Sequence, residues 1–306
     1  MKNRFKIPFF VLILFAFYSC KKDETSTNTN PTRVNSMTDF NASHKKPTQH
    51  FTMNANTAGS IITTGGIEFY FPPNSLINSS GVAVTGNVDV QIDEVITKAD
   101  MFFNEISTHS DGRPLKSGGA FKIKVTQGSE TLSMASGQQY HAWLTSNYFE
   151  PLMQTYYGIP TTDQYGIINW TTTPPGFTQD VFTNTTDSVN IYEMLLDEFD
   201  WINCDFPYDS LFSELNIALP SGSESCQIMV IDNSAMFGIN LWTNGNTARW
   251  NYAPLNKSLS VVVMKKINAE YKISAQTFLF TGQQITMPGL TTISEADLET
   301  LINTFQ

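Results

Sequence analysis

The sequence predicts an all-β protein: two antiparallel β-sandwich domains and a short C-terminal helix, preceded by a signal peptide and a disordered tether. Three observations support this class. Apolar and polar residues alternate in many short runs after residue 51, turn-forming Gly, Asn and Asp separate these runs, and helical spacing occurs only at the end of the chain. Short alternating strands separated by turns are typical of antiparallel sandwiches.

The first residues have the features of a secretion signal. Lys2, Arg4 and Lys6 form a basic segment, and the stretch 7–18 that follows is apolar and uncharged. A membrane-spanning helix needs about 20 apolar residues, so this shorter stretch is typical of the hydrophobic region of a signal peptide. The sequence therefore predicts a signal peptide over residues 1–19.

A cysteine follows this stretch directly. Ser19 precedes Cys20, and a small residue before a cysteine at this place resembles the lipobox of bacterial lipoproteins, although Phe17 stands where Leu is usual. The resemblance implies that Cys20 is acylated, with palmitate-type chains, and becomes the N-terminus. Two or three acyl chains give stable attachment where one does not. The alternative is an ordinary signal peptide before an incidental cysteine.

Residues 20–50 are rich in Asn, Thr, Ser and Lys with sparse apolar residues, which predicts a disordered tether. The charged run that begins it, 21–24, resembles the surface-export signal of Bacteroidota lipoproteins. That resemblance implies an outer-membrane protein that faces the cell exterior. The alternative is a generic solvated linker.

Residues 51–200 form the first predicted sandwich, with an aromatic-rich extension after residue 137. Alternation predicts strands at 67–71, 88–92, 121–125, 140–144, 167–170 and 188–194. Turn signals lie at Ser80-Gly81, Asp111-Gly112 and Ser117-Gly118-Gly119.

Residues 201–306 form the second predicted sandwich. Apolar runs predict strands at 215–219, 228–231, 259–263 and 271–275. At the end, Ser294 and Asp297 resemble a helix capping box, and the apolar residues at 298, 301, 302 and 305 share one face. The chain is therefore expected to end in a short amphipathic helix.

Several segments resemble known proteins. The run 66–76, Gly-Ile-Glu-Phe-Tyr-Phe-Pro-Pro-Asn-Ser-Leu, resembles the opening of ZU5-like β-sandwich domains, and 84–88 resembles their next strand. The segments 101–103, 110–115, 117–121 and 201–205 resemble a group of Bacteroidota surface lipoproteins of unassigned activity. The resemblance implies a fold and a cell-surface location, and it brings no catalytic residues.

Composition excludes several function classes. The formal charge is −10, and removal of three basic residues with the signal peptide takes it to −13, so phosphate backbones repel the chain and nucleic acid is not an expected partner. The four histidines form no metal-binding motif, and neither a nucleophile elbow nor a phosphate-binding loop is present. We therefore expect no metal, no cofactor and no catalytic residues.

Two cysteines remain besides Cys20. Cys204 and Cys226 are separated by 22 positions in an oxidising compartment, where a disulfide would contribute about 3 kcal/mol. The alternative is two separate buried thiols, which behave as small apolar side chains.

Three further features have a functional and a structural interpretation. His109-Ser110 resembles the self-cleavage dipeptide of some ZU5-type domains, and the alternative is a surface turn. The acidic residues at 197, 198, 200, 205 and 209 offer oxygen ligands for Ca²⁺, or form a solvated loop. Trp242 and Trp250 flank a turn-forming run, which predicts a hairpin tip that exposes a ligand surface for sugar rings; the alternative is packing inside the sandwich.

The sequence thus favours a membrane-anchored cell-surface lipoprotein with a non-enzymatic binding, adhesion or structural role. Its expected partners are the lipid bilayer, through Cys20, and a surface protein or a carbohydrate. One alternative is an enzyme, either a surface glycan hydrolase or a self-cleaving module. Another alternative is an accessory subunit of a secretion or gliding complex.

Overall fold

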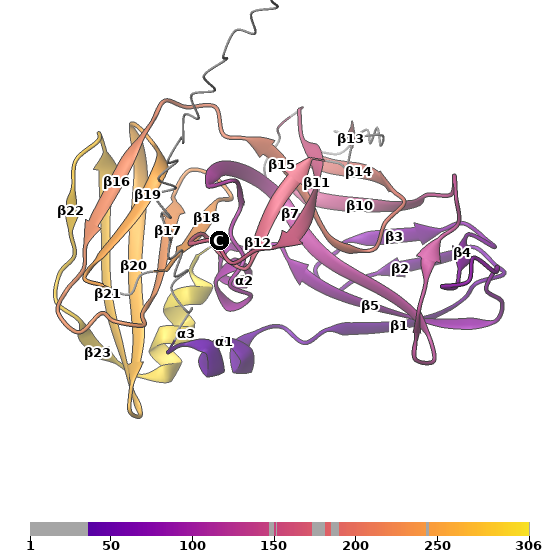
Figure 1. Ribbon diagram of the computed structural model, residues 1–306, viewed down its shortest axis with the longest axis horizontal. Coiled ribbons are helices and arrows are strands. Elements are labelled where there is room, and N and C mark those ends of the chain that lie inside the picture. The colour runs from indigo at the N-terminus through magenta and orange to yellow at the C-terminus, as the bar shows by residue number, and fades with distance from the viewer. Residues whose placement is uncertain are drawn as a thin grey trace, which may run out of the picture. The chain divides into compact units, whose positions relative to one another are not determined.

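The computed structural model describes residues 36–146, 150, 152–172, 181–184, 190–242 and 245–305, which belong to one compact unit. The predicted signal peptide, Cys20 and the first part of the predicted tether lie outside these residues. The predicted all-β class is confirmed: antiparallel sheets dominate, the helices are short, and one of them ends the chain (Figure 1). No helix in this described part is long and apolar enough to cross a membrane.

The first sandwich consists of two sheets that face each other, and we call them sheet A and sheet B. The main strands of sheet A are, in spatial order, β1 (Gln49–Asn54), β5 (Asn87–Val95), β7 (Arg113–Gln127), β15 (Asp200–Pro207), β11 (Gln154–Pro160) and β12 (Ile168–Thr172). Two short strands, β6 (His109–Ser110) and β8 (Glu130–Thr131), also pair with β7. Sheet B consists of β13 (Val181–Asn184), β14 (Asn190–Leu196), β10 (Tyr140–Ser146), β3 (Glu68–Phe71) and β2 (Gly59–Ile62). Beside them, β4 (Leu76–Ile77) pairs with β9 (Ser133–Met134).

The second sandwich also has two sheets, here called sheet E and sheet F. Sheet E consists of β19 (Thr247–Pro254), β16 (Phe212–Ala218) and β22 (Ile285–Thr286), and the β16–β22 pair is parallel. Sheet F consists of β18 (Gly238–Leu241), β17 (Gln227–Asp232), β20 (Lys257–Ile267), β21 (Glu270–Phe280) and β23 (Thr291–Ile293). Alternating side chains explain why these segments form sandwiches, because one face of each strand is buried.

Buried apolar side chains form three cores. One fills the first sandwich and includes Phe69, Phe121 and Tyr140, and another fills the second sandwich and includes Phe237 and Trp250. The third core lies between sheets A and F and joins the sandwiches; we call it the central core. Its members come from both sheets and from the helices, for example Phe102, Trp170, Trp201, Met229, Val262 and Leu298.

The three helices close the central core. They are α1 (Thr38–His44), α2 (Lys98–Phe103) and α3 (Glu295–Asn303), and each buries apolar residues in this core. The predicted C-terminal helix is confirmed as α3, whose N-cap Ser294 accepts a hydrogen bond from the backbone of Asp297 at 3.1 Å. Leu298 and Ile302 on its apolar face are fully buried.

Buried polar side chains also form hydrogen bonds across the central core, between the two sandwiches. The amide of Gln227 on β17 donates to the Phe102 carbonyl at 3.1 Å and accepts from Asn41 of α1 at 2.8 Å. Asn240 on β18 donates to the Ile106 carbonyl at 3.0 Å, and its backbone N–H donates to Ser107 at 2.7 Å. Because each bond joins one sandwich to a helix or loop of the other, the polar pairs define the register in which the sandwiches meet.

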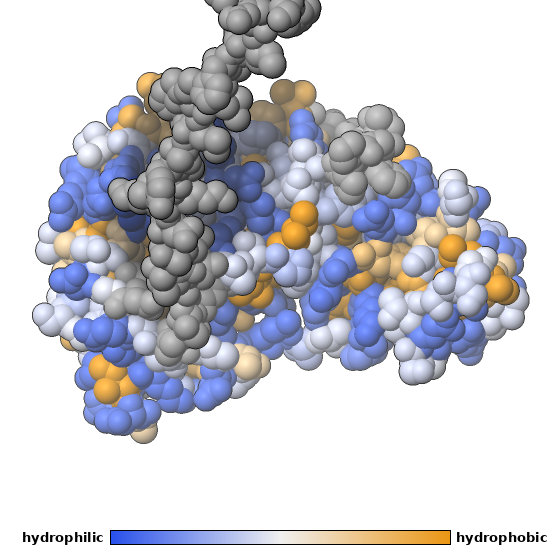
Figure 2. All heavy atoms as spheres, viewed as in Figure 1, coloured by the Kyte–Doolittle hydropathy of each residue, from blue (hydrophilic) through white to orange (hydrophobic). Residues whose placement is uncertain are grey.

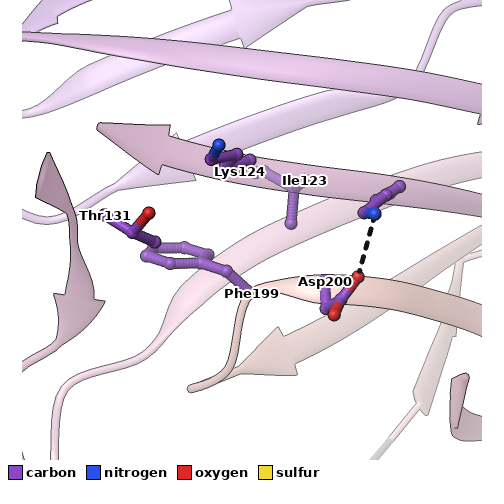
Figure 3. A pocket seen from close by; sticks show the side chains of 6 residues that line it. Ile123, Lys124, Thr131, Phe199 and Asp200 are labelled. Carbon is purple, nitrogen blue, oxygen red and sulfur yellow. Dashed lines mark ion pairs between the residues drawn. The ribbon is translucent and has the colours of Figure 1, made fainter. Parts of the chain in front are cut away.

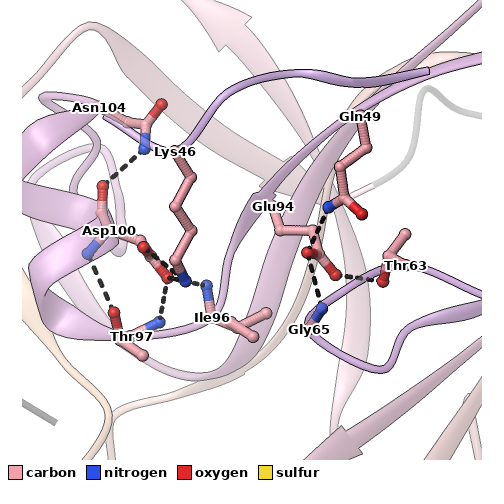
Figure 4. A network of polar contacts seen from close by, with 9 residues as sticks. All are labelled: Lys46, Gln49, Thr63, Gly65, Glu94, Ile96, Thr97, Asp100 and Asn104. Atoms are coloured by element: carbon pink, nitrogen blue, oxygen red, sulfur yellow. Dashed lines mark hydrogen bonds and ion pairs between the residues drawn. The ribbon is translucent and has the colours of Figure 1, made fainter. Parts of the chain in front are cut away.

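The predicted disordered tether is wrong for residues 36–50, which form α1 and the start of β1. The reason is that Phe40 is buried in the central core and that polar contacts hold the following residues (Figure 4). Lys46 reaches the carboxylate of Asp100 at 2.9 Å, and Gln49 donates to Glu94 at 2.6 Å. A short apolar segment that packs on another element gives no long periodic run in sequence.

Two other expectations differ from the structure. Ser117-Gly118-Gly119 is not a turn but lies inside β7, where the glycines let other chain segments approach: a Cβ on Gly118 would lie 3.2 Å from the Cys204 carbonyl. The expected domain boundary at 200/201 falls at the start of β15, which pairs with β7 and β11 of sheet A. The second sandwich begins with β16.

We expect Phe102→Ala to lower the free energy of unfolding by about 3–5 kcal/mol, because Phe102 is fully buried in the central core and its removal leaves a cavity. Urea unfolding measures the change. Leu279→Ala is the matched control, since Leu279 is 58% exposed and should change stability by less than about 0.5 kcal/mol. Equal effects of the two substitutions would contradict the role given to the central core.

Candidate functional site

The candidate site begins at the β6–β7 hairpin, whose turn the sequence predicts. Asp111 and Gly112 have φ angles of 50° and 79°, the left-handed values that a two-residue hairpin turn requires and that Asp-Gly supplies. Asn169 of β12 holds this turn, because its side chain exchanges hydrogen bonds of 2.8 and 2.9 Å with Asp111. The hairpin thereby places Ser110 and Arg113 at the end of sheet A that adjoins the second sandwich.

A hollow of about 440 Å³ lies beside this hairpin. Its walls come from β7, β11 and β12 of sheet A and from the segment that leads into β16. They present three aromatic rings, from Tyr156, Tyr208 and Phe212, together with polar groups: hydroxyls, one guanidinium and one carboxylate, from Ser110, Thr171, Thr172, Arg113 and Asp111. Such a mixture of apolar walls and a few polar groups is typical of small-ligand sites.

A second hollow, of about 150 Å³, lies next to the first and shares Tyr208 with it. Its other polar lining residues are Lys116, Glu150, Ser234 and Lys257. We call the two hollows, with Arg113, Lys116, Tyr156, Tyr208 and Lys257 as their defining residues, the Tyr208 groove. Since both sandwiches contribute lining residues, the groove exists only when the sandwiches are docked.

Basic side chains lie close to aromatic rings in and beside this groove. The ammonium groups of Lys116 and Lys257 lie 5.3 and 5.7 Å from the centre of the Tyr208 ring, and the Arg113 guanidinium lies 4.9 Å from the centre of the Tyr252 ring. These distances are typical of cation–π contacts. Lys116 also pairs with Glu150 at 3.9 Å, whereas Arg113 and Lys257 form no ion pair with any residue that the structure describes.

Tyr208 is held from behind by a buried carboxylate. Its hydroxyl donates to Asp232, which is fully buried and also accepts two hydrogen bonds of 2.7 Å from Ser234. Burial, and then the contact with Asp232, raise the pKa of Tyr208 above its ordinary value. The ring is therefore a neutral phenol in a defined orientation, with its face toward the two lysines.

A second buried carboxylate lies behind Tyr156. Asp205 on β15 is fully buried, and one of its oxygens accepts a 2.6 Å hydrogen bond from Asn203, which in turn accepts from Ser117 at 2.9 Å. Burial raises the pKa of Asp205 well above its usual range, and the hydrogen bond from Asn203 acts in the opposite direction. Burial and the nearby Asp205 also raise the pKa of Tyr156 to about 12.

The predicted ligand surface at Trp242 and Trp250 is wrong. Trp250 is fully buried, stacks on Phe237 at 5.4 Å and donates its indole N–H to the Gly112 carbonyl at 2.9 Å. Trp242 is 7% exposed. Trp250 therefore packs the second sandwich against the β6–β7 turn and supports the groove without lining it.

Two other large aromatic side chains, Tyr157 and Trp170, are also buried. The Trp170 indole donates to the Ser107 carbonyl at 2.7 Å. These rings fill cores because a sandwich needs large side chains between its sheets.

The disulfide considered between Cys204 and Cys226 is not formed. Cys204 lies in the core of the first sandwich and Cys226 in that of the second, and both are free thiols. Burial raises the pKa of both thiols, that of Cys226 to about 12, so both remain protonated and unreactive.

The remaining candidates from the sequence are the His109-Ser110 dipeptide and the acidic residues considered for Ca²⁺. His109 is fully buried, and its ring nitrogen Nδ1 accepts a hydrogen bond from the Gly112 N–H at 3.1 Å, so the His109-Ser110 dipeptide is part of a closed hairpin. Of the acidic residues considered for Ca²⁺, Asp205 is fully buried on β15 and Asp200 pairs with Lys122 at 3.6 Å. Within the described residues, no group of three His, Cys, Asp or Glu side chains is placed to hold a metal ion.

A further hollow, of about 310 Å³, lies where β15 begins (Figure 3). Phe199 lies beside Thr131, and the ion pair between Asp200 and Lys122 crosses one side. Fewer polar groups converge here than in the Tyr208 groove, so the groove is the stronger candidate. On the face shown in Figure 2, hydrophilic residues predominate and hydrophobic residues form small separate groups.

Sequence reasoning missed the groove. The Asp-Gly turn signal identified its hairpin, but the lysines and Tyr208 come from separate segments that only the docked sandwiches bring together. No family model, curated protein or solved structure matches the chain.

We expect Asp205→Asn to stabilise the protein at pH 7. The folded state keeps the Asp205 proton at pH values where the unfolded chain has released it. The native stability is therefore unaffected by the ionisation of Asp205 below the pKa that this carboxyl has in the unfolded chain. Above it, stability is lost as pH rises toward the folded-state pKa, by about 1.4 kcal/mol per pH unit. Asparagine imitates the neutral acid at every pH.

Urea unfolding at several pH values tests this expectation. The stability difference between the variant and the unmodified protein should be large at pH 7 and should shrink toward about pH 4. A difference that is independent of pH would contradict the assignment of a protonated Asp205.

Proposed function

We propose that the protein is a lipid-anchored lipoprotein of the outer membrane, displayed on the cell exterior, and that it binds a ligand in the Tyr208 groove without catalysing a reaction. The anchor is supported by the basic segment, the short apolar stretch and the Ser19-Cys20 junction at the N-terminus. Outward display is supported by the charged run after Cys20.

The observation that carries the binding role is the convergence of cations and aromatic rings on one concave surface. Arg113 and Lys257 have no ion-pair partner among the described residues, although acidic residues outnumber basic ones in the chain by 28 to 18. The groove's own carboxylates have other partners, because Asp111 accepts from Asn169 and Glu150 pairs with Lys116, so Arg113 and Lys257 keep no ion-pair partner among the described residues. A ligand that carries a carboxylate, sulfate or phosphate group would compensate these two positive charges.

The size and the lining of the Tyr208 groove restrict the class of ligand further. Hollows of about 300 to 1,000 Å³ accommodate small organic ligands, and the larger hollow, at about 440 Å³, is within this range. The aromatic walls suit a ligand with an apolar face, and the hydroxyls of Thr171 and Thr172 suit one with polar groups at its edge. An acidic saccharide combines these properties with negative charge.

Removal of the groove cations should therefore weaken binding of acidic polysaccharides. We expect Arg113→Ala and Lys257→Ala each to weaken binding of polygalacturonate or dextran sulfate by about 10-fold, because each removes a charged hydrogen-bond donor. Affinity electrophoresis measures the change, with neutral dextran as the probe without charge. Lys124→Ala is the control, because Lys124 lines the hollow of Figure 3 and carries the same charge.

Equal weakening by the Lys124 variant, or equal retardation by neutral dextran, would contradict a specific anion site in the groove. The same experiment at rising ionic strength gives a second readout, since charge-based binding weakens as salt screens the groove.

The anchor has its own test. We expect the protein from native membranes to begin at Cys20 and to carry the mass of its acyl chains, and Cys20→Ser to leave the membrane fraction because serine cannot form the thioether. Intact-mass spectrometry measures the acylation, and protease treatment of whole cells measures outward display. An unmodified chain in the medium would contradict the anchor.

A further inference from the structure

A second surface cluster lies on the outer face of sheet B, away from the residues of the Tyr208 groove. Alternation along β3 and β10 buries Phe69, Ala142 and Leu144 and turns their neighbours outward. The outward residues are Glu68, Tyr70, His141, Trp143 and, from β14, Glu193. We call this set the Trp143 cluster, and all five residues are partly exposed.

Strand register places a carboxylate on each side of the Trp143 indole. Trp143 pairs directly with Glu68 of β3 and with Glu193 of β14, and directly paired residues share one face of a sheet. His141 stands two positions from Trp143 and stacks on it, with ring centres 5.3 Å apart and planes inclined by 25°. Tyr70 meets His141 edge to face at 5.8 Å.

The two carboxylates differ in their partners. Glu193 forms a 2.8 Å contact with His141 Nδ1, which holds both side chains. The Glu68 side chain forms no hydrogen bond or ion pair with another residue in the described part of the chain. No cation in the described part of the chain therefore neutralises the Glu68 carboxylate, which lies beside the Trp143 indole.

Five aromatic rings elsewhere in the described chain have a basic side chain beside them. Lys and Arg side chains lie within 6 Å of the ring centres of Trp201, Phe206, Tyr208, Tyr252 and Tyr271. Within the described residues, no Lys or Arg lies over Trp143 or Tyr70. The Trp143 cluster thus has the aromatic faces and the carboxylates of a cation site, and its one basic group among the described residues, His141, is engaged with Glu193 and not with Glu68.

We propose that the Trp143 cluster binds a basic segment of a partner protein, with a guanidinium or ammonium group placed between Trp143 and Glu68. Charge complementarity supports this occupant, because the cluster has two carboxylates in a chain of net charge −10. The geometry selects a segment over a single small cation. Glu68 and Glu193 lie on strands about 10 Å apart with Trp143 between them, so a segment with two basic groups meets both more readily than one ammonium group does.

A segment in the polyproline II conformation repeats every three residues, so two basic residues three positions apart lie on one face, about 9 Å from each other, and meet both carboxylates. The test therefore uses the peptide acetyl-Arg-Gly-Gly-Arg-amide as the probe. The same peptide with citrulline in place of arginine is its neutral control, because citrulline keeps the shape and removes the charge. Isothermal titration calorimetry on the folded protein without its signal peptide measures binding.

We expect the arginine peptide to bind and the citrulline peptide not to bind. Trp143→Ala and Glu68→Gln should each weaken binding of the arginine peptide by about 2- to 5-fold, as expected for an exposed cation–π and carboxylate contact. The matched control is Glu270→Gln, which removes the same charge from β21 of sheet F, where Glu270 pairs with Lys272 at 3.0 Å. This control should leave binding unchanged.

Three results would overturn the proposal. Equal weakening by Glu270→Gln would show attraction to the overall charge instead of to the cluster. Tetramethylammonium binding as tightly as the peptide would show a small-cation site. Binding of neutral cellohexaose that Trp143→Ala abolishes and Glu68→Gln does not would show a sugar-stacking site. Because Glu68→Gln is conservative and exposed, its result stands even if Trp143→Ala fails to fold.

Discussion

The central core is the constraint on which the rest of the structure depends. Parts of sheet A and of sheet F are buried on both faces, because they pack against their own sandwich partner on one face and against the other sheet on the other. Strand β17 illustrates this: Ile228 and Val230 point into the second sandwich, whereas Met229 and Ile231 point into the central core. The helices α1, α2 and α3 close the open side of this core. Area buried on both faces of a sheet favours one folded unit over two independent domains.

The polar contacts explain why the docking has one register. Apolar surfaces alone allow several arrangements, but the hydrogen bonds of Gln227 to Asn41 and Phe102, and of Asn240 to Ile106 and Ser107, form in one arrangement. Leaving such buried amides without partners costs free energy, so a shifted arrangement is disfavoured. The Tyr208 groove follows from this register, since Arg113 and Tyr156 belong to one sandwich and Lys257 to the other. The two proposed binding surfaces thus differ in origin: the groove requires docking, and the Trp143 cluster belongs to sheet B alone.

The sequence predicts the elements of this fold better than their assembly. Alternation located strands such as β3, β5, β7 and β21, and the cap Ser294 located α3, because these signals are local. The same alternation also holds the information for the Trp143 cluster: Tyr70 lies between buried Phe69 and Phe71, so it faces outward. By contrast, α1 and the groove depend on contacts between distant segments, and Trp250 is buried because the β6–β7 turn covers it. Local sequence patterns give no information about such contacts between distant segments.

Calorimetric unfolding of residues 36–306 tests the central claim most directly. If the central core joins both sandwiches into one cooperative unit, the protein should unfold in a single transition whose calorimetric enthalpy equals the van't Hoff enthalpy. Two separate transitions, each with the enthalpy of about half the chain, would show that the sandwiches are independent domains. In that case the central core would not hold the groove together.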